Sequence, residues 1–295
     1  RTDGTYVSSN TSSIPLAQLV DGRSDDFKKH FMITHFFNPP RYLRLLEMVT
    51  GDKTDPKAVE IVRDFCDRKL GKGVVFCHDT PGFIANRIGA FWLQAGVNAA
   101  FDLKLSVEEA DAVMSRPVGI PKTGVFGLID LVGLDLMPHL SKSLMSNLPK
   151  TDPYHDLYRE YDLINDLIGK GYTGRKGKGG FYRLNTEGGQ RVKESIGLWT
   201  GEYEPSKKAK PPAVQAAKDG GIRALMTHDD KTGEYAWDVL SRTLHYAASL
   251  VGEIADTVYD IDRAMKLGYN FKKGPFELID EMGAGWFADQ LKAHD

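Results

Sequence analysis

The chain has 295 residues, of which 41% are hydrophobic and 26% are charged, values typical of a globular protein with two or three domains. A formal net charge of −2 argues against a nucleic-acid partner, and no apolar run approaches the roughly 18–20 residues that span a bilayer. The eight histidines form no metal-ligand pattern such as H-E-x-x-H, so we expect no metal. Cys66 and Cys77 lie in apolar segments, which predicts buried free thiols in a reducing compartment.

Residues 31–37 predict a buried strand, because they are apolar or aromatic apart from Thr34 and His35. Asn38 and the two prolines after it end the strand, since proline has no amide for the ladder and restricts the residue before it. His35 is therefore expected near the end of a strand, where open α/β sheets hold their chemistry.

Glu47 interrupts the apolar run of residues 45–49. A carboxylate in such a run is costly to bury unless it has a partner, and His35 is a suitable one. A histidine–carboxylate dyad holds the imidazole in one tautomer, ready to act as a general base. For an isolated pair, the alternative is a satisfied core histidine and a glutamate on an edge strand.

The next elements continue an α/β pattern and then become helical. Asp55-Pro56 predicts the start of a helix that stops near Gly71, and residues 73–77 predict a short strand. A long helix is expected to start beside Pro81-Gly82, with further helices at 106–115, 126–147 and 154–169. Residues 185–233 are polar and contain proline and glycine, which predicts a linker with one short helix near 213–226. Its lysines at 207, 208 and 210 are interpreted as solvated rather than as a phosphate site.

The last segment repeats the first helical one. A long helix is expected over 237–258, and the pattern G-x-F-x-L-I-D at 124–130 recurs at 274–280, an offset of about 150 residues. Two helical bundles are therefore predicted, with apolar faces packed on each other. Glu277 stands where the first copy has Gly127, so the copies are not interchangeable.

Five separate motifs resemble the 3-hydroxyacyl-CoA dehydrogenase family in order and spacing, and together they cover roughly residues 5–183. They are V-S-S-N-T-S-S-I at 7–14, H-F-F-N-P at 35–39, Glu47, D-T-P-G-F-I-A-N-R at 79–87 and G-Y-T-G-R-K-G-K-G-G-F-Y at 171–182. The resemblance implies an α/β part followed by an all-α part. Residues 1–80 would be the C-terminal part of a Rossmann-like NAD-binding domain, 81–184 a first helical domain, 185–233 a linker and 234–295 a second helical domain.

That family opens with a strand, a G-x-G-x-x-G turn and a helix that hold the cofactor pyrophosphate. The nearest glycine cluster here, at 174–180, follows no apolar strand and opens no helix, so it does not fit that role. We therefore expect the chain to start inside its nucleotide-binding domain, at Arg1. We also expect the polypeptide alone to be inactive and to show no measurable NAD binding.

The resemblance assigns His35 as general base and Glu47 as the group that orients it. Asn86 and Ser12 would contact the substrate, Ser12 and Asn38 the nicotinamide end of NAD, and Lys176 the cofactor. Simpler alternatives are a turn or cap for Ser12, an exposed helix position for Asn86 and a solvated turn for Lys176.

The activity implied is NAD-dependent oxidation of (S)-3-hydroxyacyl-CoA to 3-ketoacyl-CoA in fatty-acid β-oxidation. The tandem helical copy resembles large fatty-acid oxidation multienzymes, in which an enoyl-CoA hydratase unit is fused to the dehydrogenase. In those proteins the second copy replaces a dimer partner, which would make an intrachain pseudo-dimer. The location would be cytoplasmic in a bacterium or archaeon, and mitochondrial or peroxisomal in a eukaryote.

Two other functions remain open. A non-catalytic helical docking module of a multienzyme is disfavoured because such a module has no need of a buried carboxylate. Another β-hydroxyacid dehydrogenase is disfavoured because those enzymes usually rely on a lysine base.

Overall fold

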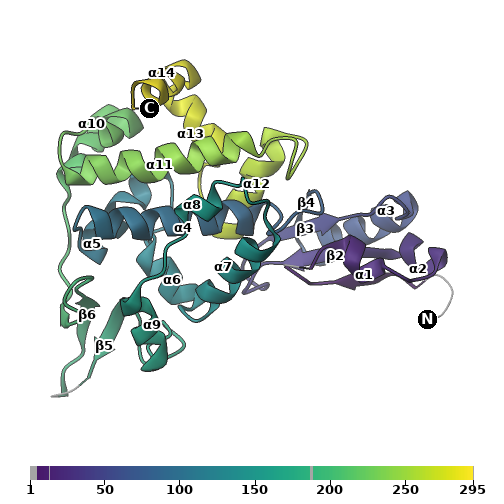
Figure 1. The fold of residues 1–295 in the computed structure, drawn as a ribbon, viewed down its shortest axis with the longest axis horizontal. Coiled ribbons are helices and arrows are strands. Elements are labelled where there is room, and N and C mark those ends of the chain that lie inside the picture. The colour runs from purple at the N-terminus through teal and green to yellow at the C-terminus, as the bar shows by residue number, and fades with distance from the viewer. Residues whose placement is uncertain (1–4, 13, 187–188, 295) are drawn as a thin grey trace. The chain divides into compact units, whose positions relative to one another are not determined.

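A computed structural model of the chain describes residues 5–12, 14–186 and 189–294, and Arg1 lies outside them. The chain forms two compact units (Figure 1): unit 1 is Arg1–Gly89 with Tyr246–Glu277, and unit 2 is Ala90–His245 with Leu278–Asp295. Three helices pass from one unit into the other: α4 (Ala85–Asp102), α11 (Lys231–Ser249) and α13 (Pro275–Met282). The division of the chain at residues 80, 184 and 233 stays a prediction.

Unit 1 is built on a four-stranded sheet in the order β1-β2-β3-β4, with β1 (Val7–Ser9), β2 (Phe31–Phe36), β3 (Leu45–Val49) and β4 (Gly73–Phe76). The outer pairs are parallel and the central pair, β2 with β3, is antiparallel. The helices in this part are α1 (Leu16–Val20), α2 (Asp25–Lys29) and α3 (Pro56–Asp64), which continues as the π-helix η1 (Phe65–Lys69). The strands predicted near 31–37 and 73–77 are confirmed. The predicted start of α3 is confirmed too, because the Asp55 side chain accepts the Lys57 amide.

The two faces of this sheet are covered by different parts of the chain. On one face, Met32, Leu46, Met48 and Val74 pack with Ala58 and Cys66, so α3 and η1 cover it. Side chains alternate along a strand, so His35 and Glu47 belong to the other face. Helix α12 (Val258–Tyr269) contacts β3 and β4. A Cβ at Gly268 would lie 2.8 Å from Leu45, a neighbour of Glu47 on that same face. Cys66 and Cys77 are buried and free, as predicted.

Unit 2 is helical. It contains α5 (Val107–Val113), η2 (Arg116–Val118), α6 (Phe126–Val132), α7 (Leu136–Asn147), α8 (Tyr154–Leu157), α9 (Asp162–Gly169), α10 (Pro212–Met226) and α14 (Ala284–His294). The single helix expected over 126–147 is two helices, because Gly133 adopts a φ of 117° between them. The helix expected over 154–169 is likewise two. Helix α11 ends at Ser249 and Val258 opens α12, so the predicted helix over 237–258 was wrong beyond residue 249.

The stretch expected to be a polar linker is partly a small sheet. Strands β5 (Tyr182–Asn185), β6 (Val192–Ile196) and β7 (Tyr203–Pro205) form an antiparallel sheet in the order β5-β6-β7. Its polar strands are stabilised by side-chain pairs, among them Arg183 Nε donating to Glu194 Oε2 at 2.6 Å. The short helix predicted in the same stretch is confirmed as α10, which is kinked at Gly221.

The sequence repeat is also a repeat of structure. In unit 2, the Asp111 carboxylate accepts the backbone amides of Phe126 and Gly127 at 2.7 and 3.1 Å. In unit 1, Asp262 accepts the amides of Phe276 and Glu277 at 2.8 and 3.0 Å in the same way. Each aspartate therefore holds the start of the following helix, α6 or α13. Among the described residues, no helix combines the length and apolar character needed to cross a membrane.

Candidate active site

His35 and Glu47 form a hydrogen-bonded pair at the centre of the sheet in unit 1. They stand directly opposite each other in the antiparallel register of β2 and β3, which brings together residues twelve positions apart. The distance from His35 Nδ1 to Glu47 Oε2 is 2.7 Å. Glu47 is fully buried and His35 is 6% exposed, and the imidazole packs against the rings of Phe37 and Phe83. Glu47 therefore lies on a central strand, and the alternative of an edge strand does not apply.

The second oxygen of Glu47 is bound by the start of helix α4. Glu47 Oε1 accepts the backbone amides of Ile84 and Ala85 at 3.1 and 2.9 Å. The partial positive charge of a helix N-terminus stabilises a carboxylate placed there. Because Glu47 is an acceptor toward these amides, it is also expected to accept at Oε2, which makes His35 Nδ1 the donor. The proton of the neutral ring is then on Nδ1, and Nε2 is free of it.

The other ring nitrogen, His35 Nε2, has no hydrogen-bond partner in the part of the chain that the structure describes. A basic nitrogen oriented through its neighbour and without a partner of its own is the arrangement that a general base requires. Asn86 is half-buried in the first turn of α4, next to the amide that Ala85 gives to Glu47.

Ser12 lies half-buried in the loop after β1, and that loop is bound to the neighbouring elements by two residues to which sequence reasoning gave no role. Asn10 Oδ1 accepts the amide of Phe36, next to His35, at 2.9 Å. Asp79 accepts the amides of Leu16 and Ala17 at 2.8 and 3.2 Å and so holds the start of α1. The signal for each was its place in a family motif: Asp79 opens the D-T-P-G-F motif, and Asn10 lies in V-S-S-N-T-S-S-I.

Asn38 is exposed just after β2. Strands β1 and β2 are parallel, so the segments that carry Ser12 and Asn38 leave the sheet at the same edge. Ligands of open α/β sheets bind outside the carboxyl ends of the strands. Five of the residues predicted for the site therefore lie in the same unit, unit 1: Ser12, His35, Asn38, Glu47 and Asn86.

Lys176 belongs to unit 2, where its ammonium lies 2.8 Å from Asp135 Oδ1. This ion pair holds the pKa of Asp135 below its usual range, chiefly through the hydrogen bond from Lys176. Both side chains are partly exposed, so the pair contributes little to stability. Lys176 is thus a turn lysine with an acidic partner, and its contact with a cofactor stays a prediction.

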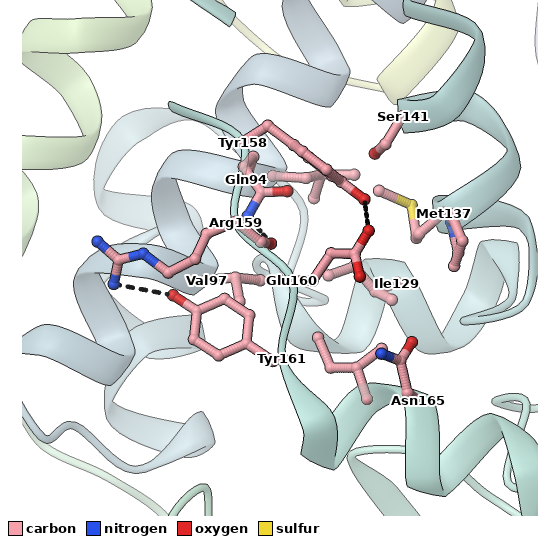
Figure 2. A pocket seen from close by; sticks show the side chains of 13 residues that line it. Gln94, Val97, Ile129, Met137, Ser141, Tyr158, Arg159, Glu160, Tyr161 and Asn165 are labelled. Carbon is pink, nitrogen blue, oxygen red and sulfur yellow. Dashed lines mark hydrogen bonds between the residues drawn. The ribbon is translucent and has the colours of Figure 1, made fainter. Parts of the chain in front are cut away.

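A separate cavity of about 100 Å³ lies in unit 2, in the first helical copy. Figure 2 shows polar and apolar side chains lining it together, and Tyr158 donates to Glu160 at 2.8 Å. None of the sequence-predicted site residues lines this cavity. Its apolar lining includes Leu93, Val97, Ile129, Met137, Pro138 and Ile164.

Comparison with known protein families identifies the two parts of the chain. Residues 1–80 match the family described as 3-hydroxyacyl-CoA dehydrogenase, NAD binding domain. Residues 82–184 and 235–294 each match the 3-hydroxyacyl-CoA dehydrogenase, C-terminal domain. The chain therefore belongs to the 3-hydroxyacyl-CoA dehydrogenase family, as its motifs indicated, and the predicted class of fold, α/β followed by helical, is confirmed.

Individual relatives agree with this assignment. A putative fatty acid oxidation complex trifunctional enzyme of Rickettsia felis is 41% identical over 92% of the chain. A probable 3-hydroxyacyl-CoA dehydrogenase of Bacillus subtilis is 39% identical over 99% of it. The chain spans only 37% of the length of each of these relatives.

Solved structures show a similar fold. The 3-hydroxybutyryl-CoA dehydrogenase of Escherichia coli aligns with 98% of this chain and 72% of its own, with a TM-score of 0.68 and 22% identity. The (S)-3-hydroxybutyryl-CoA dehydrogenase of Ralstonia eutropha aligns with 61% of this chain and 60% of its own, with a TM-score of 0.52 and 30% identity.

Proposed function

We propose that the His35–Glu47 dyad is the catalytic centre of an enzyme that oxidises (S)-3-hydroxyacyl-CoA to 3-ketoacyl-CoA with NAD. One observation carries the proposal: a buried carboxylate, held by two helix amides, binds Nδ1 of an imidazole whose Nε2 has no partner among the described residues. A structural histidine in a core needs neither the buried charge nor the helix N-terminus. A docking module needs no such pair at all.

The residues at the edge of the sheet fit the nicotinamide end of NAD. The exposed Asn38 amide offers a donor and an acceptor, and the half-buried Ser12 hydroxyl offers another of each. We propose that these two side chains hold that end of the cofactor, with Lys176 as a further contact. When bound, NAD supplies the ring that accepts a hydride.

In this proposal, residues of the chain accept the proton that the substrate hydroxyl loses. His35 Nε2 takes the proton of the substrate hydroxyl as the hydride leaves the same carbon. The imidazole then carries a positive charge, which the Glu47 carboxylate stabilises at 2.7 Å. Burial strengthens this attraction because the local dielectric is lower than that of water. Ser12 and Asn86 would orient the hydroxyl and the acyl carbonyl so that the proton lies within reach of Nε2.

The substrate class and the larger assembly rest on the relatives. The Rickettsia felis protein is named as a fatty acid oxidation complex trifunctional enzyme, and the Ralstonia eutropha structure is named for a coenzyme A thioester of a 3-hydroxy acid. We extend this to an acyl-CoA substrate and to an enoyl-CoA hydratase unit as the partner in fatty-acid oxidation.

The test is His35→Gln in the intact natural protein. Loss of the base is expected to slow hydride transfer by roughly two to four orders of magnitude, measured as NADH formed from a 3-hydroxyacyl-CoA. His30→Gln is the control, because His30 is the C-cap of α2 and its ring contacts the Asp26 carbonyl and the Tyr6 ring rather than Glu47. Near-normal turnover in His35→Gln, or equal losses in both variants, contradicts the assignment.

A further inference from the structure

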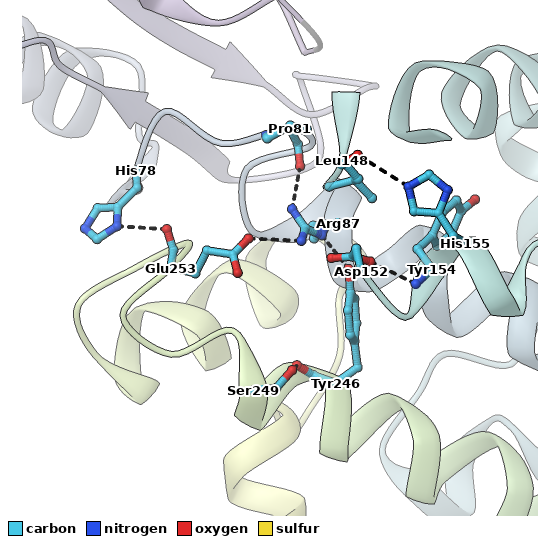
Figure 3. Close-up of polar contacts among 10 residues, drawn as sticks. All are labelled: His78, Pro81, Arg87, Leu148, Asp152, Tyr154, His155, Tyr246, Ser249 and Glu253. Atoms are coloured by element: carbon cyan, nitrogen blue, oxygen red, sulfur yellow. Dashed lines mark hydrogen bonds and ion pairs between the residues drawn. The ribbon is translucent and has the colours of Figure 1, made fainter. Parts of the chain in front are cut away.

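Arg87 has one of the largest fully buried side chains in the described part of the chain, and it lies in the first turn of α4. Figure 3 shows its guanidinium among the Pro81 carbonyl, the Tyr246 hydroxyl and the Glu253 carboxylate. Nε donates to Tyr246, Nη2 lies 3.0 Å from Glu253 Oε1, and Nη1 donates to the Pro81 carbonyl at 3.4 Å. All of these residues belong to unit 1, although Tyr246 and Glu253 come from the second helical copy.

The segment that Arg87 binds is the turn that delivers the amides to Glu47. In this turn Gly82 and Phe83 adopt φ angles of 77° and 49°, both in the left-handed region. Glycine adopts that region freely, but phenylalanine does so at a cost, and such a conformation persists only where its surroundings fix it. The next two residues, Ile84 and Ala85, bind Glu47 Oε1. A relaxation of the turn would withdraw those two donors.

We propose that Arg87, held by Tyr246 and Glu253, is a positioning residue for the His35–Glu47 dyad. It fixes the turn at residues 81–85, and through the turn it fixes the orientation of the Glu47 carboxylate. The inference rests on the proposed function only in treating the dyad as catalytic. The geometric claim, that Tyr246 and Glu253 set the hydrogen bond between Glu47 and His35, stands by itself.

A second set of contacts binds the same two segments. The His78 amide donates to the Ile254 carbonyl at 2.9 Å, and the His78 ring lies 2.9 Å from both the Glu253 carbonyl and Asp256 Oδ1. His78 lies just before the turn at residues 81–85 and Arg87 just after it, and both bind the segment 253–256. The turn is held at both ends by one loop of the second copy.

The charge of Arg87 explains why its partners matter. A guanidinium cannot be deprotonated in a protein, so its burial requires acceptors and a counter-charge. Glu253 supplies the charge from a half-exposed position, and Tyr246 and Pro81 supply neutral acceptors. Removal of one of these acceptors is expected to displace the guanidinium, and the turn with it.

The test compares Glu253→Gln and Tyr246→Phe with a matched control in the intact natural protein. The control is Glu277→Gln, because Glu277 also belongs to unit 1 and forms a partly exposed ion pair, at 2.6 Å with Lys266. Two measurements are made on each variant. One is kcat and KM for a 3-hydroxyacyl-CoA, and the other is the low-field proton resonance of the His35 Nδ1–H bonded to Glu47.

Both test variants are expected to lower kcat by about tenfold with KM changed less than about twofold, because a small displacement of oriented groups mainly affects the chemical step. The His35 resonance is expected to shift in both variants and to stay in place in Glu277→Gln. A melting temperature lowered as in the control, with kcat and the resonance unchanged, overturns the proposal.

The resonance also separates the two proposals. If the natural protein does not oxidise a 3-hydroxyacyl-CoA, the proposed function fails. The resonance alone then decides whether Tyr246 and Glu253 position the dyad, and an unshifted resonance in both variants rejects that idea.

Discussion

The two oxygens of Glu47 have separate partners, and this division explains how one residue serves both the fold and the site. Oε1 binds the helix amides of Ile84 and Ala85, and Oε2 binds the imidazole of His35. The amides fix the carboxylate, and the fixed carboxylate orients the ring. The pairing could be predicted from the sequence because an acidic residue in an apolar run needs a partner. The two amides could not be predicted, since they lie 37 and 38 positions from Glu47. They also bind through the backbone, so the identities of Ile84 and Ala85 do not indicate the contact.

Glu47→Gln tests this division at the level of one residue. A glutamine has one acceptor and one donor end, so it cannot accept from His35 and from both amides at once. It also removes the negative charge that stabilises the imidazolium. We expect kcat to fall by about ten- to a hundredfold while KM changes less, measured in steady-state assays of hydroxyacyl-CoA oxidation.

Glu60→Gln, on the exposed surface of α3, is the matched control. Turnover in Glu47→Gln equal to that in this control means that the dyad is a packing contact and not a catalytic one.

Helix starts in both copies depend on buried aspartates, and these make stability sensitive to pH. Burial raises the pKa of Asp111 to about 7, against a hydrogen bond from Tyr182 and the amides of Phe126 and Gly127, which lower it. Burial likewise raises the pKa of Asp262 to about 6. The folded state thus binds these protons more tightly than the unfolded chain does, where the pKa is 3.8. Their contribution to stability is fully present below about pH 4 and is lost as the pH rises toward 7.

Asp111→Asn removes one of these titrations. Between pH 5 and 7, the free energy of unfolding of the natural chain is expected to fall more steeply than that of the variant, by up to about 1.4 kcal/mol per pH unit. Urea unfolding at a series of pH values measures this difference in slope.

Asp156→Asn, at an exposed position of α8, should leave the slope unchanged. Parallel curves for Asp111→Asn and the natural chain contradict the raised pKa.

The elements that sequence reasoning located correctly are those with a strong apolar pattern or a recognisable start. Strand β2 and helix α3 are examples, the first by its continuous apolar run and the second by Asp55-Pro56. The small sheet β5-β6-β7 was missed because its strands carry charged residues on both faces, and the pair Arg183–Glu194 replaces the apolar pattern. The break between α6 and α7 depends on the φ of Gly133, and a glycine inside a helical pattern gives only a weak sign of one.

At the scale of the molecule, the second helical copy completes unit 1. Helix α12 packs on β3 and β4, and Arg263 Nη1 donates to the Val74 carbonyl of β4 at 2.7 Å. The sequence showed the duplication, and its resemblance to multienzymes implied that the second copy replaces a dimer partner. It did not show that this copy contacts unit 1, because each contact pairs a small residue with a large one far away in the sequence. Gly73 against Leu267 and Gly89 against Tyr269 are two such contacts.

The contact between Gly89 and Tyr269 allows a direct test of how the second copy supports the site. Gly89 lies in α4, one turn after the amides that bind Glu47, and a Cβ there would lie 1.9 Å from the Tyr269 hydroxyl oxygen. Gly89→Ala must therefore displace either α4 or the tyrosine, and such overpacking costs about 1–3 kcal/mol of unfolding free energy. The gain in helix propensity, about 1 kcal/mol, offsets only part of this cost.

Tyr269→Leu removes the aromatic ring that the new methyl group would meet. Alone it should destabilise the protein, because it leaves a space beside Phe37, whose ring is 6.0 Å from that of Tyr269. Combined with Gly89→Ala it should cost less than the sum of the two single changes, by about 1 kcal/mol or more in urea unfolding. Gly285→Ala is the control, since a Cβ at Gly285 meets nothing. Strict additivity of Gly89→Ala and Tyr269→Leu would show that α4 and α12 do not support each other at this point, and the second copy would then have to stabilise the dyad by some other contact.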